Sequence, residues 1–475
     1  MTPPAADLIV VGTGPAGANA ALAAASCGLS VILLDEASAA GGQVWRAPWP
    51  GLEAPGTGGD ATRGDAMRAR LADSPVVTLF GRRVWSVTER FRVDALGSNG
   101  NEAFVAPRLI AATGAVERVL PFLGWTLPGV VGLAAATVLL KAHAVLPGRR
   151  VVVAGCGPLL AAVAAGVLKG GGEVVAVIDR STKGEWLQRM PQLASRPSLL
   201  REGFGWLLKI ARARVPVLFG HAVTAARGEG QVEEVTVAPL GTSARIGGTA
   251  VRRFAVDALC VGDGLAPGGE IPKLMRAQHR FDRRRGGWVP TLGEGGRTSV
   301  EGLYAAGDGA GIRGAAPAVH AGTIAGLTAA LDAGRLSADA FAQRAVEHQR
   351  ALVTLRKFAD AMADLMSLRA AHVQTIAPEV VVCRCEDVTR ADIDAAFEAG
   401  ATEVNQLKHF TRCGMGPCQG RMCGDVAAEL LAWRAGSRER VGMWTGRPPL
   451  RPVPLADLVG SFSYADIPIP EPAPL

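Results

Sequence analysis

Residues 7–36, DLIVVGTGPAGANAALAAASCGLSVILLDE, decide the expected fold, because they predict a strand, a glycine-rich turn, a helix and a second strand. In the turn G-x-G-x-x-G, the first glycine allows a tight turn, the second lets a pyrophosphate approach the backbone, and the third permits close helix–strand packing. An acid 23 residues after the first glycine stands where a ribose hydroxyl pair is bound. We therefore predict a dinucleotide site, rather than a bland glycine-rich turn, at Gly12, Gly14, Pro15, Ala16, Gly17 and Asp35, with Glu36 as the alternative ribose ligand.

The composition predicts a soluble α/β protein of about three domains. The chain has 475 residues, 49% of them hydrophobic, and its 60 glycines against two tyrosines favour a small-residue helix-and-strand interior over an aromatic all-β one. The formal net charge of +7 comes from scattered basic residues without a nucleic-acid-binding motif, so no nucleic-acid partner is expected. The first six residues do not resemble a signal peptide, and charged residues interrupt the longest apolar runs, so we expect a cytoplasmic protein without a membrane span.

Three later turns of small residues extend the predicted nucleotide site. The first, Gly41-Gly42-Gln43, could let the chain pass the far end of the cofactor, and a second follows the apolar strand that ends in IAATG. In TSVEGLYAAGDGAGIRGAAPAVHAG, a strand delivers an acid that can accept a ribityl hydroxyl, and a helix follows from about Ala316. These turns add the candidate cofactor-binding residues Gly42, Gln43, Thr113, Gly114, Gly307 and Asp308.

Residues 149–180, RRVVVAGCGPLLAAVAAGVLKGGGEVVAVIDR, form a second copy of the opening unit. The copy keeps Gly155-x-Gly157 and an acid, Asp179, but has Leu160 at the third glycine position. A leucine there should push the helix away from the strand, so an emptied or altered pocket is expected rather than a nicotinamide site. Helices are predicted over 184–215, where distributed arginines favour a solvated face first and a partner surface second.

This order of units over residues 7 to about 335 resembles the flavoproteins of the thioredoxin reductase and glutathione reductase type, which have two dinucleotide folds. The resemblance implies that FAD is held by Gly12, Gly14, Gly17, Asp35 and Asp308. Those enzymes carry a redox cysteine pair beside the flavin, whereas Cys27, Cys156 and Cys260 are isolated in apolar segments here. Disulfide reduction is therefore not expected.

Five of the eight cysteines lie between residues 383 and 423, and in a reducing compartment such a group points to metal or redox chemistry. Cys383-x-Cys385 and Cys418-x4-Cys423 flank a predicted helix. Structural zinc usually uses C-x2-4-C pairs, so C-x-C disfavours zinc but leaves it open. The segment resembles the bacterioferritin-associated-ferredoxin-like 2Fe-2S domain, with its pattern C-x-C followed by G-M-G-x-C-Q-G-x-x-C. This resemblance implies Cys383, Cys385, Cys418 and Cys423 as ligands and Cys413 as a neighbour only.

The predicted domain organisation follows from these motifs. A first part of the FAD-binding domain (1–120) precedes an inserted NAD-binding-like domain (121–265) and the second FAD-binding part (266–345). A helical connector (346–378) then leads to the 2Fe-2S domain (379–432) and a proline-rich tail (433–475). We expect the tail to dock through its apolar residues Trp444, Leu450, Leu455 and Leu458.

Nearly the whole chain, including GGQ at 41–43, PFLGWTLPGV at 121–130 and RPPLRPVPL at 447–455, resembles the FAD and iron-sulfur subunits of multi-subunit dehydrogenases. These are the opine oxidases (octopine and nopaline dehydrogenases), the middle subunit of hydrogen cyanide synthase, and the alpha subunits of D-hydroxyproline and dye-linked L-proline dehydrogenases. The resemblance implies an oxidoreductase subunit in a hetero-oligomer that relays electrons from a D-amino-acid-oxidase-like FAD subunit, with a small ferredoxin-like subunit as a further partner.

Alternatives to this expectation concern both the cofactor and the function. Related alpha subunits, including that of tetrameric sarcosine oxidase, hold NAD or ATP in a comparable fold and FMN at a subunit interface. One other function is a self-sufficient NAD(P)H-dependent reductase, and another is a non-catalytic assembly subunit. No motif places a carboxylate clamp for an amine substrate, so we expect no catalytic residue of amine oxidation on this chain.

Overall fold

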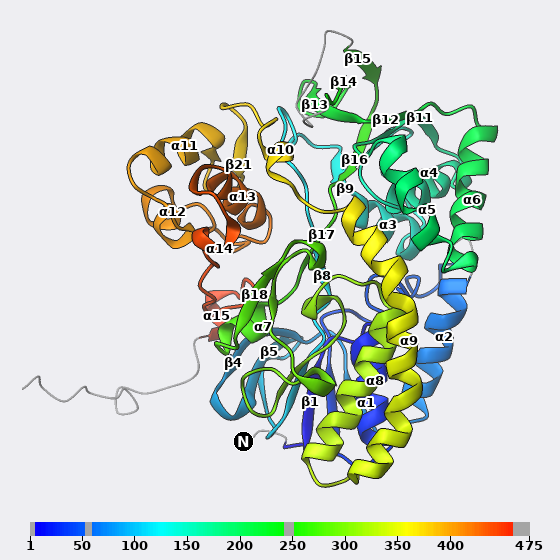
Figure 1. Ribbon diagram of the computed structural model, residues 1–475, viewed down its shortest axis with the longest axis vertical. Helices are drawn as coiled ribbons and strands as arrows, with labels where there is room; N and C mark the ends of the chain where they lie inside the picture. The colour runs from blue at the N-terminus through cyan, green and yellow to red at the C-terminus, as the bar shows by residue number, and fades with distance from the viewer. Residues whose placement is uncertain (1–4, 53–58, 242–250, 459–475) are drawn as a thin grey trace, which may run out of the picture.

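The computed structural model describes residues 5–52, 59–241 and 251–458. In Figure 1, one parallel sheet lies in the lower half, a second lies at the upper right, and a small helical domain lies at the upper left. The mixed α/β architecture predicted from the sequence is confirmed, because two separate parallel sheets are each covered by helices.

The lower sheet follows from the alternation of buried residues in its short apolar strands. Its order is β20 (Leu303–Ala305), β7 (Leu109–Ala111), β1 (Leu8–Val11), β2 (Val31–Leu34) and β3 (Val77–Leu79), all parallel. Leu8 and Val10 face a core shared with α1 (Pro15–Ala25) and α8 (Ala315–Asp332), while Ile9 and Val11 face the opposite core. The second face is covered by the antiparallel strands β4 (Arg83–Thr88), β5 (Arg92–Gly97) and β6 (Gly100–Val105).

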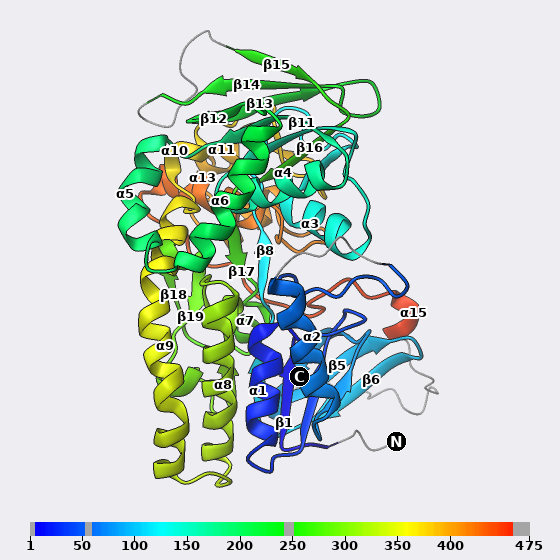
Figure 2. The same cartoon turned by 90° about the vertical axis from the view of Figure 1, so that its right-hand side faces the viewer.

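The upper sheet repeats this plan. Its parallel order is β12 (Val217–Phe219), β11 (Glu173–Asp179), β10 (Arg150–Gly155), β16 (Ala258–Gly262) and β9 (Val130–Gly132). One face packs on α3 (Leu133–Ala142), α4 (Leu159–Lys169) and α6 (Pro197–Arg212), with α5 (Lys183–Leu193) beside them. The other face is covered by β13 (His221–Arg227), β14 (Glu234–Pro239) and β15 (Arg252–Ala255), which form an antiparallel sheet at the top of Figure 2.

Two antiparallel strands connect the sheets, which is why the upper domain is an insertion into the lower one. β8 (Ala115–Glu117) leaves the lower sheet and pairs with β17 (Leu265–Pro267), which returns to it. The returning chain adds α7 (Glu270–Leu274) and the hairpin β18 (His279–Asp282) and β19 (Gly287–Pro290). α2 (Gly59–Ala72) packs on the lower domain, and the long α9 (Ala338–Leu365) runs beside α8 toward the upper domain (Figure 2).

The helical domain at the upper left contains α10 (Ala370–Val373), β21 (Val381–Cys383), β22 (Val388–Thr389), α11 (Arg390–Glu398), α12 (Val404–Thr411), α13 (Gly424–Ala435) and α14 (Arg438–Val441). Thr389 begins α11 with a capping box, in which its side chain accepts from Asp392 N and the Asp392 carboxylate accepts from Thr389 N. Such reciprocal bonds satisfy two helix-end donors and set where the helix begins.

Two of the four apolar tail residues dock, Trp444 on the helical domain and Leu450 on the lower domain. Trp444 Nε1 donates to Gly424 O at 2.9 Å, and Leu450 is buried with its backbone N bonded to Trp85 O at 2.6 Å. Leu455 and Leu458, in α15 (Leu455–Leu458), are exposed, so the expectation that they anchor the tail is wrong for these two residues. Residues 459–475 lie outside the described residues. No helix of the described ranges is long and apolar enough to cross a membrane.

Candidate functional site

The predicted nucleotide-binding residues meet at the carboxyl edge of the lower sheet. Gly12 follows β1, Asp35 follows β2, Thr113 follows β7 and Asp308 follows β20. These strands are neighbours in the order β20-β7-β1-β2 and all run parallel, so four turns that are distant in sequence end side by side. Ligands of open α/β sheets bind at this edge, outside the carboxyl ends of the strands.

The glycine turn has a closed side and an open side. Gly12 has φ +103°, and a methyl group added at Gly17 would stand 1.8 Å from the Gly12 oxygen, so helix and strand are packed as closely as the third glycine predicts. A methyl group added at Gly14 would meet no atom nearer than 3.9 Å, which is the Cα of Gly42. This open side faces the start of α1 at Pro15, where free backbone N–H groups and the helix dipole favour a phosphate. The turn therefore fits a pyrophosphate.

Asp35 is held against this turn. Its Oδ2 accepts hydrogen bonds from Thr13 N at 2.5 Å and from Thr13 Oγ1 at 2.6 Å, and its Oδ1 accepts from Ala37 N at 2.8 Å. Each carboxylate oxygen has two lone pairs, so Oδ1 keeps capacity for a ribose hydroxyl. Glu36 is exposed and stands 3.7 Å from the guanidinium of Arg83, which favours Asp35 as the ribose ligand.

The three later turns lie at the same edge. Thr113 Oγ1 donates to Gly268 O, and Gly114 accepts from Gly268 N at 2.9 Å, so this turn is tied to the strand that returns from the upper domain. Asp308 Oδ1 accepts from the backbone N of Arg313 and of Gly314, both at 2.8 Å. Burial raises the pKa of Asp308, while these two backbone bonds oppose the rise. Gln43 is exposed and accepts from Arg46 at 2.9 Å.

The second glycine turn differs at each position that would contact a dinucleotide. A methyl group added at Gly157 would stand 2.9 Å from Cγ and Sδ of Met366, so the end of α9 covers the side that is open at Gly14. Leu160 is buried in the core between α4 and the sheet. Asp179 is buried and accepts from Trp186 Nε1 and Ser181 N, both at 2.8 Å, and burial raises its pKa to about 6. Protein side chains thus occupy what would be ligand positions.

The cysteines of the helical domain fall into two neighbouring sets. The sulfur atoms of Cys383, Cys413 and Cys423 lie within 4.8 Å of one another and are buried. Hydrogen bonds from Cys413 and Cys423 lower the pKa of Cys383 to about 2, so this set favours a thiolate. Cys385 lies beside Cys418, and its pKa is raised chiefly by burial. Grouped soft donors of this kind fit a soft metal or an iron–sulfur cluster.

The sequence reasoning placed Cys413 near the ligands but outside them. The structure puts it in one buried set with two of the four predicted ligands, while Cys385 and Cys418 form a separate pair. The ligand assignment therefore stays a prediction, and the local signal for Cys413 is its place five residues before Cys418 in the same loop.

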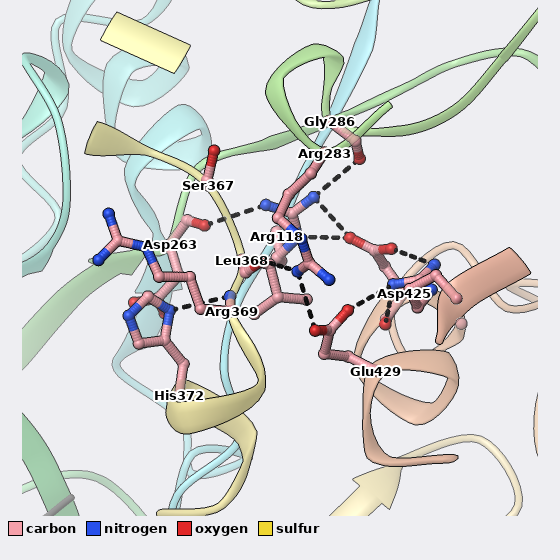
Figure 3. A network of polar contacts seen from close by, with 12 residues as sticks. Arg118, Asp263, Arg283, Gly286, Ser367, Leu368, Arg369, His372, Asp425 and Glu429 are labelled. Carbon is pink, nitrogen blue, oxygen red and sulfur yellow. Dashed lines mark hydrogen bonds and ion pairs between the residues drawn. The ribbon is translucent and has the colours of Figure 1, made fainter. Parts of the chain in front are cut away.

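A buried ion network fixes the cysteine domain to the rest of the chain (Figure 3). Arg118, directly after β8, donates from Nε to Asp425 at 2.6 Å and from Nη2 to Gly286 O at 2.9 Å. The guanidinium of Arg438 donates to the carboxylates of Asp425 at 2.8 Å and Glu429 at 3.1 Å. The guanidinium of Arg283 also donates to Glu429, at 2.8 Å, and to Leu368 O. Asp425 lies two residues after Cys423, so the network holds the cysteine loop at a defined place against the interdomain strand.

A cavity of about 310 Å³ opens between the cysteine loop, α7 and the chain from Met443 to Leu450. Lys273, Lys408 and Arg421 line it, and burial lowers the pKa of each of these three groups. Positive groups near a thiolate-ligated centre offset its negative charge. Glu270 and Asp425 line the same cavity and pair with Arg421 and Arg438, so part of this positive charge is already offset by the protein.

Comparison with known proteins decides the family. The profile of the pyridine nucleotide-disulphide oxidoreductase family matches residues 6–334, which hold both dinucleotide folds. The chain belongs to this family. Residues 378–461 match the sarcosine oxidase A3 domain. This segment of the chain contains all five clustered cysteines. This pyridine nucleotide-disulphide oxidoreductase family implies FAD binding, in agreement with the resemblance stated from the sequence.

Several relatives of this oxidoreductase are similar over nearly the whole chain. An opine oxidase subunit of Agrobacterium tumefaciens (strain Ach5) is 33% identical over 471 residues, covering 95% of this chain and 91% of the relative. The hydrogen cyanide synthase subunit HcnB of Pseudomonas protegens is 32% identical over 462 residues, covering 94% of this chain and 96% of the relative. The crystal structure of L-proline dehydrogenase from P. horikoshii has the same fold, with a TM-score of 0.71 at 22% identity, covering 96% of this chain and 80% of that one.

These comparisons confirm the predicted relationship and enzyme class. The relatives carry the names of oxidoreductase subunits, and the chain is accordingly an oxidoreductase subunit. All eight cysteines lie in the described residues, and none of them forms a disulfide bond. Cys156 and Cys260 are buried, and burial raises the pKa of both, so neither is suited to the thiolate chemistry of disulfide exchange.

Proposed function

We propose that this chain is the electron-relay subunit of a multi-subunit, FAD-dependent amino-acid or opine dehydrogenase. FAD is held at the carboxyl edge of the lower sheet, and a 2Fe-2S cluster is held by Cys383, Cys385, Cys418 and Cys423. The observation that carries the proposal is the ion network of Arg118, Asp425, Arg438, Glu429 and Arg283, which fixes a buried thiol group beside a flavin-type fold.

The residues fit both groups on structural grounds. The open side of Gly14 and the start of α1 suit the FAD pyrophosphate, Asp35 suits its adenosine ribose, and Asp308 suits its ribityl chain. The proposed cluster ligands come from two neighbouring sets of thiols: the buried set includes Cys383 and Cys423, and Cys385 lies beside Cys418. A flavin accepts two electrons at once and a 2Fe-2S cluster one at a time, so the pair suits the splitting of a hydride equivalent.

The chain's own residues would orient these groups and keep their sites dry. Gly14 and Gly42 leave the space for the pyrophosphate, and Thr13 and Ala37 hold the Asp35 carboxylate in place. Arg118 keeps the cysteine domain docked, and Trp444 packs over Gly414 and Gly424 on either side of the cysteine loop. Burial of Cys383, Cys413 and Cys423 excludes water from that centre.

The proposed partner is a D-amino-acid-oxidase-like FAD subunit that oxidises the C–N bond, with a small ferredoxin-like subunit as a second one. The relatives are named as subunits, which supports a hetero-oligomer. Eight cysteines without a disulfide bond suit the reducing cytoplasm. FMN at the subunit interface, or NAD or ATP in place of FAD, stays the alternative cofactor set. The side chain of Met366 covers the turn at Gly157. This contact counts against a self-sufficient NAD(P)H reductase, because such a reductase needs an open second turn to bind the nicotinamide dinucleotide.

The test is dye reduction by the isolated chain and by its complex with the co-expressed partner. Opines, hydroxyproline, proline and glycine are the substrates to compare. We expect turnover of one of these substrates by the complex and none by the chain alone. Turnover by the isolated chain would make it the dehydrogenase itself, and a complex whose activity survives removal of this chain would make it an assembly subunit.

A further inference from the structure

Helix α6 has apolar side chains on two opposite sides. Ile210 is buried in the core shared with α4, as a helix that packs on a sheet requires. Phe204, Leu207 and Leu208 are exposed instead, and the side chain of Phe204 is 66% exposed. Large apolar residues gathered on one exposed face mark a contact surface rather than chance.

The preceding helix α5 has exposed apolar residues of its own, but it packs elsewhere. Trp186 and Leu193 of α5 belong to an apolar cluster with Ala361, Met362 and Leu365 of α9, whereas Ile210 of α6 packs in the core with α4. Leu187 and Met190 are exposed on α5. We call the exposed residues Phe204, Leu207 and Leu208 of α6 the flank surface.

Basic residues accompany the flank surface along α6. Arg201 stands three residues before Phe204, and Arg212 four residues after Leu208, so each lies beside an apolar member on the helix surface. Lys209 and Arg214 are also exposed, and none of the four pairs with an acid among the described residues. Glu202 is the single acid of α6. The flank surface is therefore apolar with a basic border.

We propose that the flank surface binds the surface of an anionic lipid bilayer. A helix with Phe and Leu on one side and Lys and Arg beside them is the usual interfacial element, because the apolar side chains enter the acyl boundary and the cations contact headgroups. The charge argues against a second copy of this chain, since a twofold contact would bring Arg201, Lys209 and Arg212 of both copies together.

The place of the surface agrees with a role separate from electron transfer. In Figure 1, helix α6, which carries the flank surface, lies at the right edge of the molecule, and the cysteine domain lies on the left. A partner that exchanges electrons with the cysteine site would contact the other side. The proposal therefore does not depend on which subunit donates the electrons.

The test is co-sedimentation of the full chain with vesicles of phosphatidylglycerol and phosphatidylcholine in equal parts, and with phosphatidylcholine alone. We expect binding to the anionic vesicles only, weakened by added salt. The double variant Phe204→Ser, Leu207→Ser should abolish it, and Arg201→Gln with Lys209→Gln should reduce the partition coefficient about thirtyfold. Leu455→Ser is the matched control, because it removes an exposed apolar side chain elsewhere and should bind like wild type.

Light scattering of the same proteins without vesicles separates the competing occupants. We expect the oligomeric state of the wild type and of the Phe204→Ser, Leu207→Ser variant to be the same. A wild-type dimer that this variant dissociates would assign the flank surface to a second copy and overturn the proposal. Equal sedimentation of wild type and the double serine variant with anionic vesicles would also overturn it.

Discussion

The two glycine turns of this protein begin alike and end in opposite states. Both follow a buried parallel strand, and both have G-x-G-P followed by a helix and a strand that ends near an acid. At Gly14 the side that would face a ligand is open, whereas at Gly157 the side chain of Met366 covers it. Asp35 keeps acceptor capacity at the surface of its site, whereas Asp179 is buried against Trp186. A shared fold therefore does not imply a shared ligand.

The difference has a physical origin outside the turns themselves. Met366 ends α9, and the chain from there enters the cysteine domain, which is fixed by Arg118 and Arg283. The segment that carries the cysteines thus also closes the second nucleotide position.

The largest expected effect comes from exchanging matched glycines. Gly14→Asn would place a side chain in the space for the pyrophosphate without touching the protein, so bound FAD should fall at least about tenfold while the fold persists. Gly157→Asn is the control, since its neighbour Met366 is flexible and asparagine tolerates φ +85°. Flavin absorbance per purified protein measures both. Equal flavin loss in the two variants would remove the distinction between the turns.

The cysteines test whether the domain that closes the second turn is a redox domain. Replacing any one of Cys383, Cys385, Cys418 or Cys423 by serine should deplete the 2Fe-2S centre, because a cluster needs its four thiolates. Cys413→Ser should leave the iron content near normal. Iron and acid-labile sulfide analysis of each variant measures the effect. Iron loss at Cys413 as severe as at Cys423 would show that the buried set of three sulfurs is the true ligand group.

A smaller difference in FAD retention is expected between variants of the two acids, Asp35 and Asp179. Asp35→Ala should weaken FAD retention several-fold, because a hydrogen bond that replaces one to water contributes about 0.5–1.5 kcal/mol net. Asp179→Ala should leave the flavin content unchanged and destabilise the upper domain instead, since Trp186 Nε1 loses its acceptor. Equilibrium dialysis and thermal melting separate the two outcomes. A matching loss of FAD in both variants would contradict the account.

The smallest expected effect concerns Glu117, on the strand that joins the two regions. Burial raises the pKa of Glu117 to about 7 in the folded protein, above the ordinary value of 4.5. The folded state therefore binds more protons than the unfolded one between these values, and stability falls as pH rises from 4.5 to 7 and is flat above. Glu117→Gln should lessen this fall by at most about 3 kcal/mol. A urea midpoint with the same pH slope in wild type and variant would contradict the assignment.

The sequence predicted the parts of the site that depend on local pattern. The glycine turn and Asp35 are set by residues within one strand–helix–strand unit, and the expected geometry is found at both. Leu160 likewise indicated an altered second pocket. These features depend on steric and hydrogen-bonding rules that act over a few residues.

The features that the sequence did not predict depend on contacts between distant segments. Met366 lies 209 residues after Gly157, and nothing in the local pattern of α9 shows where its end will dock. The pairing of Arg118 with Asp425 spans 307 residues. Leu455 illustrates the opposite error, because an apolar side chain in a proline-rich tail suggested docking and the structure exposes it.

The most direct test of the account is stopped-flow absorbance of the purified, FAD- and iron-loaded chain. One mixing experiment uses NADH, and the other uses the reduced partner subunit with its amine substrate. The account predicts no rapid flavin bleaching with NADH, because Met366 covers the second turn, and rapid bleaching of the flavin and cluster with the reduced partner. Rapid bleaching with NADH alone, and none with the reduced partner, would contradict it.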